Sequence, residues 1–183
     1  MEKKNIKTVV IKFAIMFAVI FLFRSFRSVG FGEAGVYFKT FGGGVVTDEP
    51  PKGEGLRFVL PWDDLYIYNV KQQEVFESKM KVLSSNGLDI LLDITVLYQP
   101  VYNELGKLHQ TKGFNYVDVV IKPALRAISR SVVGNYTPEQ LYSTKRDAIE
   151  SEIEERLVEN VQSQHVQINE VLVRDVTLPA NIK

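Results

Sequence analysis

The sequence predicts an α+β domain in which helices pack on a mainly antiparallel sheet, preceded by an apolar segment at the amino terminus. Residues 88–98 alternate in the manner of a half-buried strand. Residues 137–164 instead repeat apolar side chains at helical spacing. Strand-like runs come first, helical runs follow, and another strand-like run closes the chain, which is the order expected of an α+β domain.

The opening segment contains an apolar run without a polar face. The stretch "KFAIMFAVIFLFRSFR" covers residues 12–27, and its uninterrupted apolar part is residues 13–23. This part is shorter than the roughly 20 residues that a helix needs to cross a bilayer. A removed secretory signal would need small residues at a cleavage site, but "RSFR" follows. A buried core helix would need a polar face, which this run lacks.

A membrane anchor fits the run best once its flanks are included. Residues 8–11 lengthen it upstream, Lys12 can extend its ammonium group to the lipid headgroups, and Phe26 and Val29 lengthen it downstream. The result is a short single span with little tilt, and insertion into one leaflet is the alternative. The predicted anchor residues are Val9, Val10, Ile11, Phe13, Ala14, Ile15, Met16, Phe17, Ala18, Val19, Ile20, Phe21, Leu22 and Phe23.

Charge is distributed unevenly along the 183 residues. The chain has 22 basic and 22 acidic residues, and residues 1–30 hold six of the basic residues against Glu2 alone. Positive charge ahead of an anchor favours a cytoplasmic amino terminus and a body on the non-cytoplasmic side. The mildly acidic remainder argues against a nucleic-acid partner. We therefore expect a basic segment with an anchor over residues 1–30 and one folded domain over residues 31–183.

Two features define the predicted sheet. Asn86 and Gly87 lie between two strand-like runs and predict a tight hairpin with positive φ. In the second run Asp89, Asp93 and Thr95 share one face. The opposite, buried face consists of Leu88, Ile90, Leu92, Ile94, Val96 and Tyr98. Alternation returns over residues 165–179, which predicts the last strand.

Residues 115–136 have helical spacing with an interruption. Pro123 predicts a kink or a break, and Gly134 predicts a left-handed helix terminator. The residues predicted to face inward are Val119, Val120, Leu125, Ile128 and Val132.

Residues 137–164 form the strongest helical prediction. Thr137 is placed to cap the helix, Pro138 suits its first turn, and Gln140 completes a capping box. The apolar stripe is Leu141, Ile149, Ile153, Leu157 and Val161. The acidic residues on this segment are predicted to form a solvated flank, with a partner surface as the alternative: Glu150, Glu152, Glu154, Glu155 and Glu159.

No combination of residues indicates a reaction site. His109 and His165 have no partner at metal or triad spacing and are predicted to lie at the surface or at helix ends. Asp63 and Asp64 are read as a turn or a cap. The glycines at 42–44 lack a following lysine and helix and are read as a bend. We therefore expect no catalytic residue, no cofactor and no metal. The enzymatic alternative, a membrane-tethered hydrolase, would need an activated serine or carboxylate.

Four segments carry a family resemblance: "GEAGVYFKTFGGGVV", "KGEGLRFVLPWDDLYIYNV", "SSNGLDILLDITVLYQP" and "TPEQLYSTKRDAIESEIEERL". From about residue 32 to residue 183 the chain resembles the SPFH, or Band 7, superfamily of stomatins, prohibitins and flotillins, with the closest likeness to prohibitins. The segments are structural patterns and carry no catalytic motif. Five aromatic residues just after the anchor favour a membrane interface: Phe26, Phe31, Tyr37, Phe38 and Phe41.

The resemblance implies an SPFH domain beside a lipid bilayer, in ring- or cage-like oligomers with itself or with a paralogous SPFH protein. It implies non-enzymatic scaffolding of a membrane microdomain and the enclosure or regulation of a membrane-bound AAA protease. A protease-regulatory accessory subunit without a general scaffolding role is the alternative. The membrane would be a bacterial plasma membrane or a mitochondrial inner membrane. The family usually continues into a long coiled-coil helix, whereas the sequence given stops at Lys183. Either this chain is a fragment of a longer protein or its assembly is weaker than that of the family.

Overall fold

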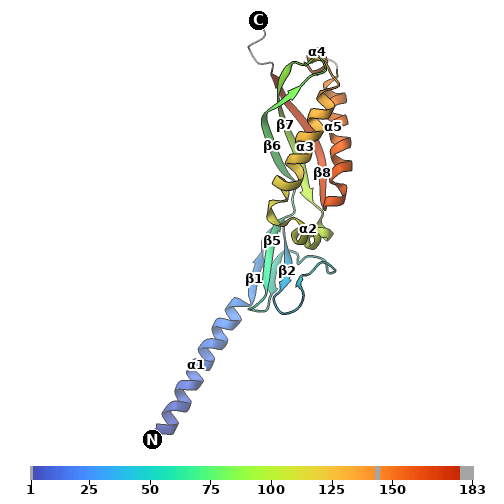
Figure 1. Cartoon of the computed structure of the whole chain (residues 1–183). Coiled ribbons are helices and arrows are strands. Elements are labelled where there is room, and N and C mark those ends of the chain that lie inside the picture. Colours follow the sequence, from blue (N-terminus) through green and yellow to red (C-terminus); the bar gives the residue numbers. More distant parts are fainter. Residues whose placement is uncertain (1, 143–144, 178–183) are drawn as a thin grey trace. The chain divides into compact units, whose positions relative to one another are not determined.

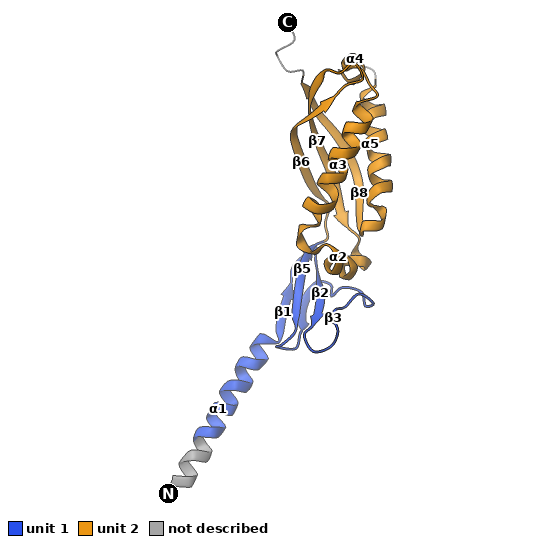
Figure 2. Cartoon of the chain, viewed as in Figure 1, with its two compact units in different colours: residues 1–69 blue, residues 70–183 orange. Residues whose placement is uncertain are grey.

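The computed structural model divides the chain into two compact units, residues 1–69 and residues 70–183 (Figure 2). The structure describes residues 2–142 and 145–177, with side chains from residue 9 onward. The expected boundary between anchor and domain at residue 30 stays a prediction.

Unit 1 begins with a long helix, α1 (Glu2–Arg24). No glycine or proline lies in this segment, so nothing in it breaks the helix. The helix ends at the buried Ser25, whose hydroxyl donates to the Phe21 carbonyl at 2.9 Å. Arg24 lies in the last turn, where a cation interacts favourably with the helix dipole.

The rest of unit 1 consists of short antiparallel strands. They are β1 (Phe26–Val29), β2 (Glu33–Lys39), β3 (Gly44–Val45), β4 (Gly55–Phe58) and β5 (Asp64–Asn69). Strands β1 and β4 form a two-stranded ribbon, while β2 lies between β3 and β5. Gly43 and Gly44 have φ of +102° and +81°, which confirms the predicted bend at the glycine run.

Unit 2 contains one three-stranded sheet in the order β6-β7-β8, all antiparallel. The strands are β6 (Gln73–Leu83), β7 (Asp89–Pro100) and β8 (Val166–Thr177). The predicted alternation is confirmed on β7, where Ile90, Leu92, Ile94 and Val96 are fully buried. Thr95 lies on the opposite face, as predicted, but it is also buried; its hydroxyl accepts a hydrogen bond from Arg174 at 2.9 Å.

The predicted hairpin joins β6 to β7. The Gly87 N–H donates to the Ser84 carbonyl at 2.9 Å, and Gly87 has φ of +79°. The Ser84 hydroxyl adds a bond to Asn86 at 2.6 Å. The turn therefore places Gly87, and not Asn86, in the left-handed region.

Helices cover one face of the unit 2 sheet. They are α2 (Leu105–Thr111), α3 (Lys122–Val133), α4 (Pro138–Tyr142) and α5 (Arg146–Val161). Short 3-10 segments span Tyr102–Glu104, Gly113–Asn115 and Gln162–Gln164. Helices α3 and α5 lie side by side over the sheet (Figure 1). All five residues of the predicted apolar stripe are buried, one on α4 and four on α5: Leu141, Ile149, Ile153, Leu157 and Val161.

The interruption at Pro123 is confirmed, with a geometry that the sequence did not indicate. Val117–Ile121 forms a π-helical turn, and α3 begins at Lys122 with Pro123 in its first turn, where the missing N–H costs little. The wider turn rotates the chain, so that Ile121 is buried while Val119 is 55% exposed. The inward prediction for Val119 is therefore wrong.

Two further predictions about the helices need correction. Gly134 ends α3 in a right-handed conformation, φ −60°, so the predicted left-handed terminator is wrong. The single helix predicted over residues 137–164 is two helices, α4 and α5. The capping box is confirmed in part, because Gln140 Oε1 accepts the Thr137 N–H at 2.9 Å. The end of the last predicted strand, residues 178–179, lies outside the described residues.

Candidate functional site

The two histidines and Asp63, which were considered as chemical candidates in the sequence, make contacts within the fold. Among the described residues, no group of three histidine or acidic side chains could hold a metal ion. His165 has φ of +64°, and its Nδ1 lies 2.9 Å from Glu104 Oε2. His109 is in the last turn of α2 with its ring against Phe114, and burial lowers the pKa of its imidazole. Both histidines lie at helix ends, as predicted.

Asp63 holds a turn of unit 1. Its N–H donates to the Leu60 carbonyl at 2.9 Å, and its carboxylate accepts the Thr40 N–H at 2.9 Å and the Tyr37 hydroxyl at 2.8 Å. Burial and the hydrogen bond to the carboxylate raise the pKa of Tyr37. The prediction of a turn at Asp63 is confirmed.

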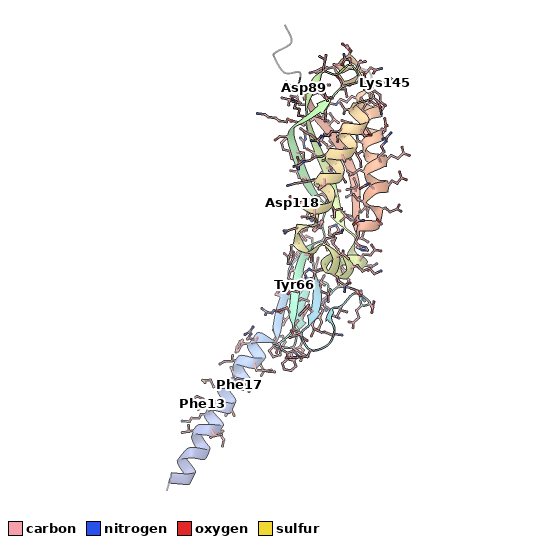
Figure 3. All side chains as sticks on the ribbon, viewed as in Figure 1. Phe13, Phe17, Tyr66, Asp89, Asp118 and Lys145 are labelled. Atoms are coloured by element: carbon pink, nitrogen blue, oxygen red, sulfur yellow. The ribbon has the colours of Figure 1, made fainter. Side chains whose placement is uncertain are left out.

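The apolar side chains of α1 are exposed around the helix. Phe13, Phe17 and Phe23 are 64%, 70% and 80% exposed, and Figure 3 shows Phe13 and Phe17 projecting from the helix. Within the described ranges, none of the helices combines the length and the hydrophobicity that a membrane crossing requires. The anchor over residues 9–23 therefore stays a prediction.

The exposed apolar side chains continue from α1 onto the strands and loops of unit 1. We call the following residues the apolar surface: Phe21, Phe26, Phe31, Phe41, Leu56, Phe58 and Trp62. Phe21 on α1 contacts the Trp62 ring at a centroid distance of 5.8 Å, and Phe41 contacts the same ring at 6.3 Å. Phe26 and Phe58 pair across the β1–β4 ribbon at 5.8 Å. The exposed rings of unit 1 thus form two contacting groups, Phe21–Trp62–Phe41 and Phe26–Phe58.

The sequence predicted part of this surface. Phe31 and Phe41 are more than 80% exposed, and Phe26 is half exposed, as expected for interfacial aromatics. Tyr37 and Phe38 are less exposed because Tyr37 bonds Asp63 and the Phe38 ring packs on Tyr66. Leu56, Phe58 and Trp62 were not singled out from the sequence. The segment "KGEGLRFVLPWDDLYIYNV", which contains all three, was used only for the family resemblance.

The ribbon has a second, cationic face. Arg27 and Arg57 are paired across β1 and β4 one position beyond the Phe26–Phe58 pair, so they project to the opposite side. The Arg57 guanidinium also donates to the Gly53 carbonyl at 2.9 Å, which fixes part of its orientation. An aromatic face backed by arginines suits a boundary between apolar and anionic surroundings.

The acidic residues of α5 have a different role from the predicted one. Glu150 accepts the Val173 N–H at 2.9 Å, and Glu154 accepts the Val171 N–H at 3.2 Å. Arg146 donates to the carbonyls of Val173 and Arg174. Side chains on successive turns of α5 therefore occupy the backbone groups along the outer edge of β8. For Glu150 and Glu154 the prediction of a solvated flank is wrong.

The SPFH domain / Band 7 family model matches residues 27–183. The chain belongs to the SPFH domain / Band 7 family. Its similarity to a mitochondrial prohibitin-4 of Arabidopsis thaliana is 25% identity over 92% of this chain and 59% of the relative. A prohibitin-2 of Mus musculus is 24% identical over 80% of this chain and 48% of the relative. The predicted likeness to prohibitins is thereby confirmed.

The SPFH chain spans about half the length of the curated relatives that it matches, from 41% of a prohibitin-2 of Dictyostelium discoideum to 59% of the Arabidopsis protein. The matched range begins at residue 27, so nearly all of the β1–β4 ribbon belongs to the SPFH domain, while α1 precedes it. Among the residues of the apolar surface, only Phe21 and Phe26 precede the family match.

Proposed function

We propose that this SPFH protein is a membrane-attached, non-enzymatic scaffold whose copies associate laterally to organise a patch of membrane. The observation that carries the proposal is the exposure of apolar side chains on α1 together with the apolar surface of unit 1. Soluble monomers rarely expose contiguous apolar patches of this extent, and such patches mark contacts with membranes or with other proteins.

In this proposal α1 attaches the chain to the bilayer as a single pass. The basic residues ahead of the apolar run stay on the cytoplasmic side, and the strands of unit 1 and the whole of unit 2 follow on the other side. The aromatic rings of the apolar surface sit at the level of the headgroups, where amphipathic rings are favoured. The membrane is a bacterial plasma membrane or the mitochondrial inner membrane. Several relatives are named mitochondrial prohibitins, which supports the second choice.

Attachment to one plane supports assembly. Copies confined to a membrane meet at a raised effective concentration, so modest lateral contacts suffice to hold them together. The partner in these contacts is a second copy of this chain or a paralogous SPFH protein, arranged in a ring or cage. On the strength of the family resemblance, the enclosed client includes a membrane-bound AAA protease, which affinity purification from crosslinked membranes would recover.

Liposome flotation tests the attachment. The double substitution Phe17→Asp and Ile20→Asp places two carboxylates in the apolar run, at a cost on the order of 2.5–3.5 kcal/mol each in a membrane. We expect the unmodified chain to float with vesicles and the double variant to lose flotation by more than tenfold. Val119→Asp, which changes a residue of unit 2 that is 55% exposed, is the control and should float normally.

Extraction from native membranes tests the scaffold. A mild detergent should release complexes many times the 20.8 kDa of the single chain. A monomer recovered from intact membranes under the same conditions would contradict lateral assembly while leaving membrane attachment untouched.

A further inference from the structure

The two edges of the unit 2 sheet differ in how their outward backbone groups are hydrogen-bonded. Strand β8 forms one edge, and the α5 side chains of Glu150, Glu154 and Arg146 occupy its outward backbone groups. Strand β6 forms the other edge. An uncovered strand edge is a template for an added strand, because its N–H and C=O groups are already aligned for pairing.

The pairing pattern shows which groups of β6 face outward. The Ser84 N–H donates to the Leu88 carbonyl at 3.0 Å, which places Ser84 and alternate residues before it on the side of β7. The backbone N–H and C=O groups of Lys81 and Leu83 therefore point away from β7, and beyond them the Ser85 N–H donates to the Tyr136 carbonyl at 3.0 Å. A bulge ends this regular stretch, because Lys79 has φ of +50° and its N–H donates to Asp93. The regular edge is thus short, about residues 80–84.

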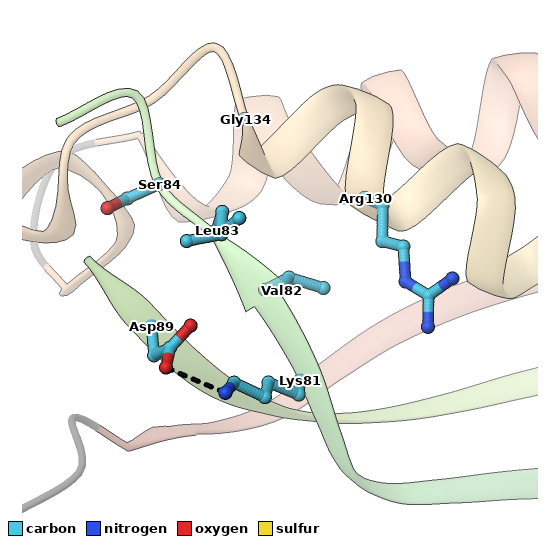
Figure 4. Close-up of a pocket in the computed structure, with 7 residues that line it drawn as sticks. All are labelled: Lys81, Val82, Leu83, Ser84, Asp89, Arg130 and Gly134. Atoms are coloured by element: carbon cyan, nitrogen blue, oxygen red, sulfur yellow. Dashed lines mark ion pairs between the residues drawn. The ribbon is translucent and has the colours of Figure 1, made fainter. Parts of the chain in front are cut away.

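A groove runs along this part of the edge. Its volume is about 670 Å³, and its walls are residues 81–84 and Asp89 on the sheet side and Arg130 and Gly134 from the end of α3. Figure 4 shows Arg130 projecting on one side of β6 and the Lys81–Asp89 pair on the other. The groove therefore lies between a strand edge and a helix, which is a setting for strand addition.

Gly134 lines one end of the groove. Its φ of −60° is available to any residue, so conformation does not require glycine here. A Cβ at this position would lie 3.1 Å from the Arg130 carbonyl oxygen and 3.7 Å from that of Leu83. The tight contact is with the carbonyl of α3 itself, whereas the distance to Leu83 is an ordinary van der Waals contact, so Gly134 lies directly beside the edge of β6.

The two cationic side chains that line the groove, Lys81 and Arg130, differ in their ion pairing. Lys81 Nζ lies 2.8 Å from Asp89 Oδ2, so this ammonium group has a partner. In the part of the chain that the structure describes, Arg130 has no carboxylate within ion-pair distance. Leu83 is 56% exposed on the face of the sheet away from the helices. The groove therefore offers a cation on its helix side and an apolar side chain on its open side.

We propose that this groove binds an extended peptide segment of a partner protein as an added strand beside β6. Successive side chains of a strand point to opposite faces, so one residue of the peptide faces α3 and the next faces Leu83. The segment that fits has a carboxylate opposite Arg130 and an apolar side chain next to it in sequence. The backbone of Lys81 and Leu83 supplies the pairing, and the two side chains supply the selectivity. The site is independent of the proposed membrane attachment.

Binding of labelled octapeptides to the full chain in detergent micelles tests the selectivity. The probes are (Val-Glu)₄, (Val-Gln)₄ and (Val-Lys)₄ with blocked ends, followed by fluorescence anisotropy. We expect (Val-Glu)₄ to bind about tenfold more tightly than (Val-Gln)₄, the scale of one charge-assisted contact. Arg130→Glu should reverse the preference toward (Val-Lys)₄. Lys107→Glu, an exposed charge reversal on α2, is the control and should retain the original order.

A second pair of variants tests strand addition itself. Lys81→Pro removes an outward N–H without removing a bond to β7, whereas Lys81→Ala keeps this N–H and removes the side chain beyond Cβ. We expect Lys81→Ala to retain most of the affinity for (Val-Glu)₄ and Lys81→Pro to lose it, with the circular dichroism of both unchanged. If Lys81→Pro fails to fold, the Arg130→Glu reversal still decides the matter. Amide hydrogen exchange should show new protection at Lys81 and Leu83.

Three results would overturn the proposal. The first is equal binding of (Val-Glu)₄ and (Val-Gln)₄. The second is peptide-induced protection on β8 or elsewhere in place of β6. The third is protection of Lys81 and Leu83 that rises with protein concentration and without peptide, because a second copy of the chain would then be the occupant.

Discussion

Units 1 and 2 use apolar side chains in opposite ways. The fully buried leucines and isoleucines of the described chain all lie in unit 2, on its sheet and its helices. The buried apolar side chains of unit 1 are Val29, Ala34, Val36, Val59 and Tyr68, while its phenylalanines and its tryptophan are mainly exposed. The comparison shows that apolar content alone does not indicate a core. Unit 2 buries its large apolar side chains in a core, whereas unit 1 leaves most of its aromatic side chains exposed.

The largest effect is expected from the core of unit 2. Leu157→Ala removes a fully buried side chain from α5 and should lower the free energy of unfolding by about 2–5 kcal/mol. The neighbouring Val158, 39% exposed, is the matched control, and Val158→Ala should cost less than about 1 kcal/mol. Urea unfolding followed by circular dichroism measures both. Similar losses for the two variants would mean that the burial on α5 is misplaced.

A smaller effect is expected where α5 bonds β8. Glu150→Ala leaves the Val173 N–H without its side-chain acceptor and should cost about 1–2 kcal/mol. Glu155→Ala, on the exposed side of the same helix, should leave stability within about 0.5 kcal/mol. Amide exchange at Val173 should accelerate in the first variant alone. Unchanged exchange there would show that the Glu150 carboxylate does not hold this edge.

The surface of unit 1 can be probed without any change in stability. Trp62 is the only tryptophan, is 44% exposed and contacts both Phe21 and Phe41. We expect brominated lipids in a nanodisc to quench its fluorescence relative to ordinary lipids. Phe41→Ser should weaken the quenching while leaving the unfolding of unit 2 unchanged. If brominated lipids do not quench Trp62 in the unmodified chain, the apolar surface does not contact lipid. Attachment would then depend on α1 alone.

The smallest effect concerns pH and His109. Burial lowers the pKa of this imidazole in the folded chain, so the folded state binds a proton less readily than the unfolded state. The stabilising contribution is therefore complete above the unfolded pKa, near 6.5, and is lost as pH falls through the folded value. Stability measured from pH 7.5 to pH 5 should decline less steeply in His109→Gln. An unchanged slope would contradict this assignment.

Local patterns allowed the prediction of single elements and their buried faces. The alternation on β7, the stripe on α5 and the hairpin at Gly87 are visible in sequence because each depends on residues a few positions apart. The π-helical turn before Pro123 reversed the prediction for Val119, since a change of helix type shifts the face without changing the sequence pattern.

The contacts that the sequence did not indicate join residues that are far apart along the chain. Phe26 meets Phe58 only because β1 pairs with β4 in one particular alignment. Glu150 meets Val173 across 23 residues for the same kind of reason. Gly134 was predicted to be a left-handed terminator, whereas it has a right-handed conformation and lies beside Leu83 of β6. None of these juxtapositions has a signature in residues that are neighbours along the chain.

The bonding between α5 and β8 limits sliding of one against the other. Four residues of a helix advance about 6.0 Å and two residues of a strand about 6.6 Å, so the two repeats nearly coincide. The mismatch of about 0.6 Å accumulates with each turn, which restricts the alignment to a few contacts such as those of Arg146, Glu150 and Glu154. An axial shift of several ångströms that stops short of a full helical turn would lose these bonds together. The pair should therefore resist shear as a rigid body and yield only in discrete steps.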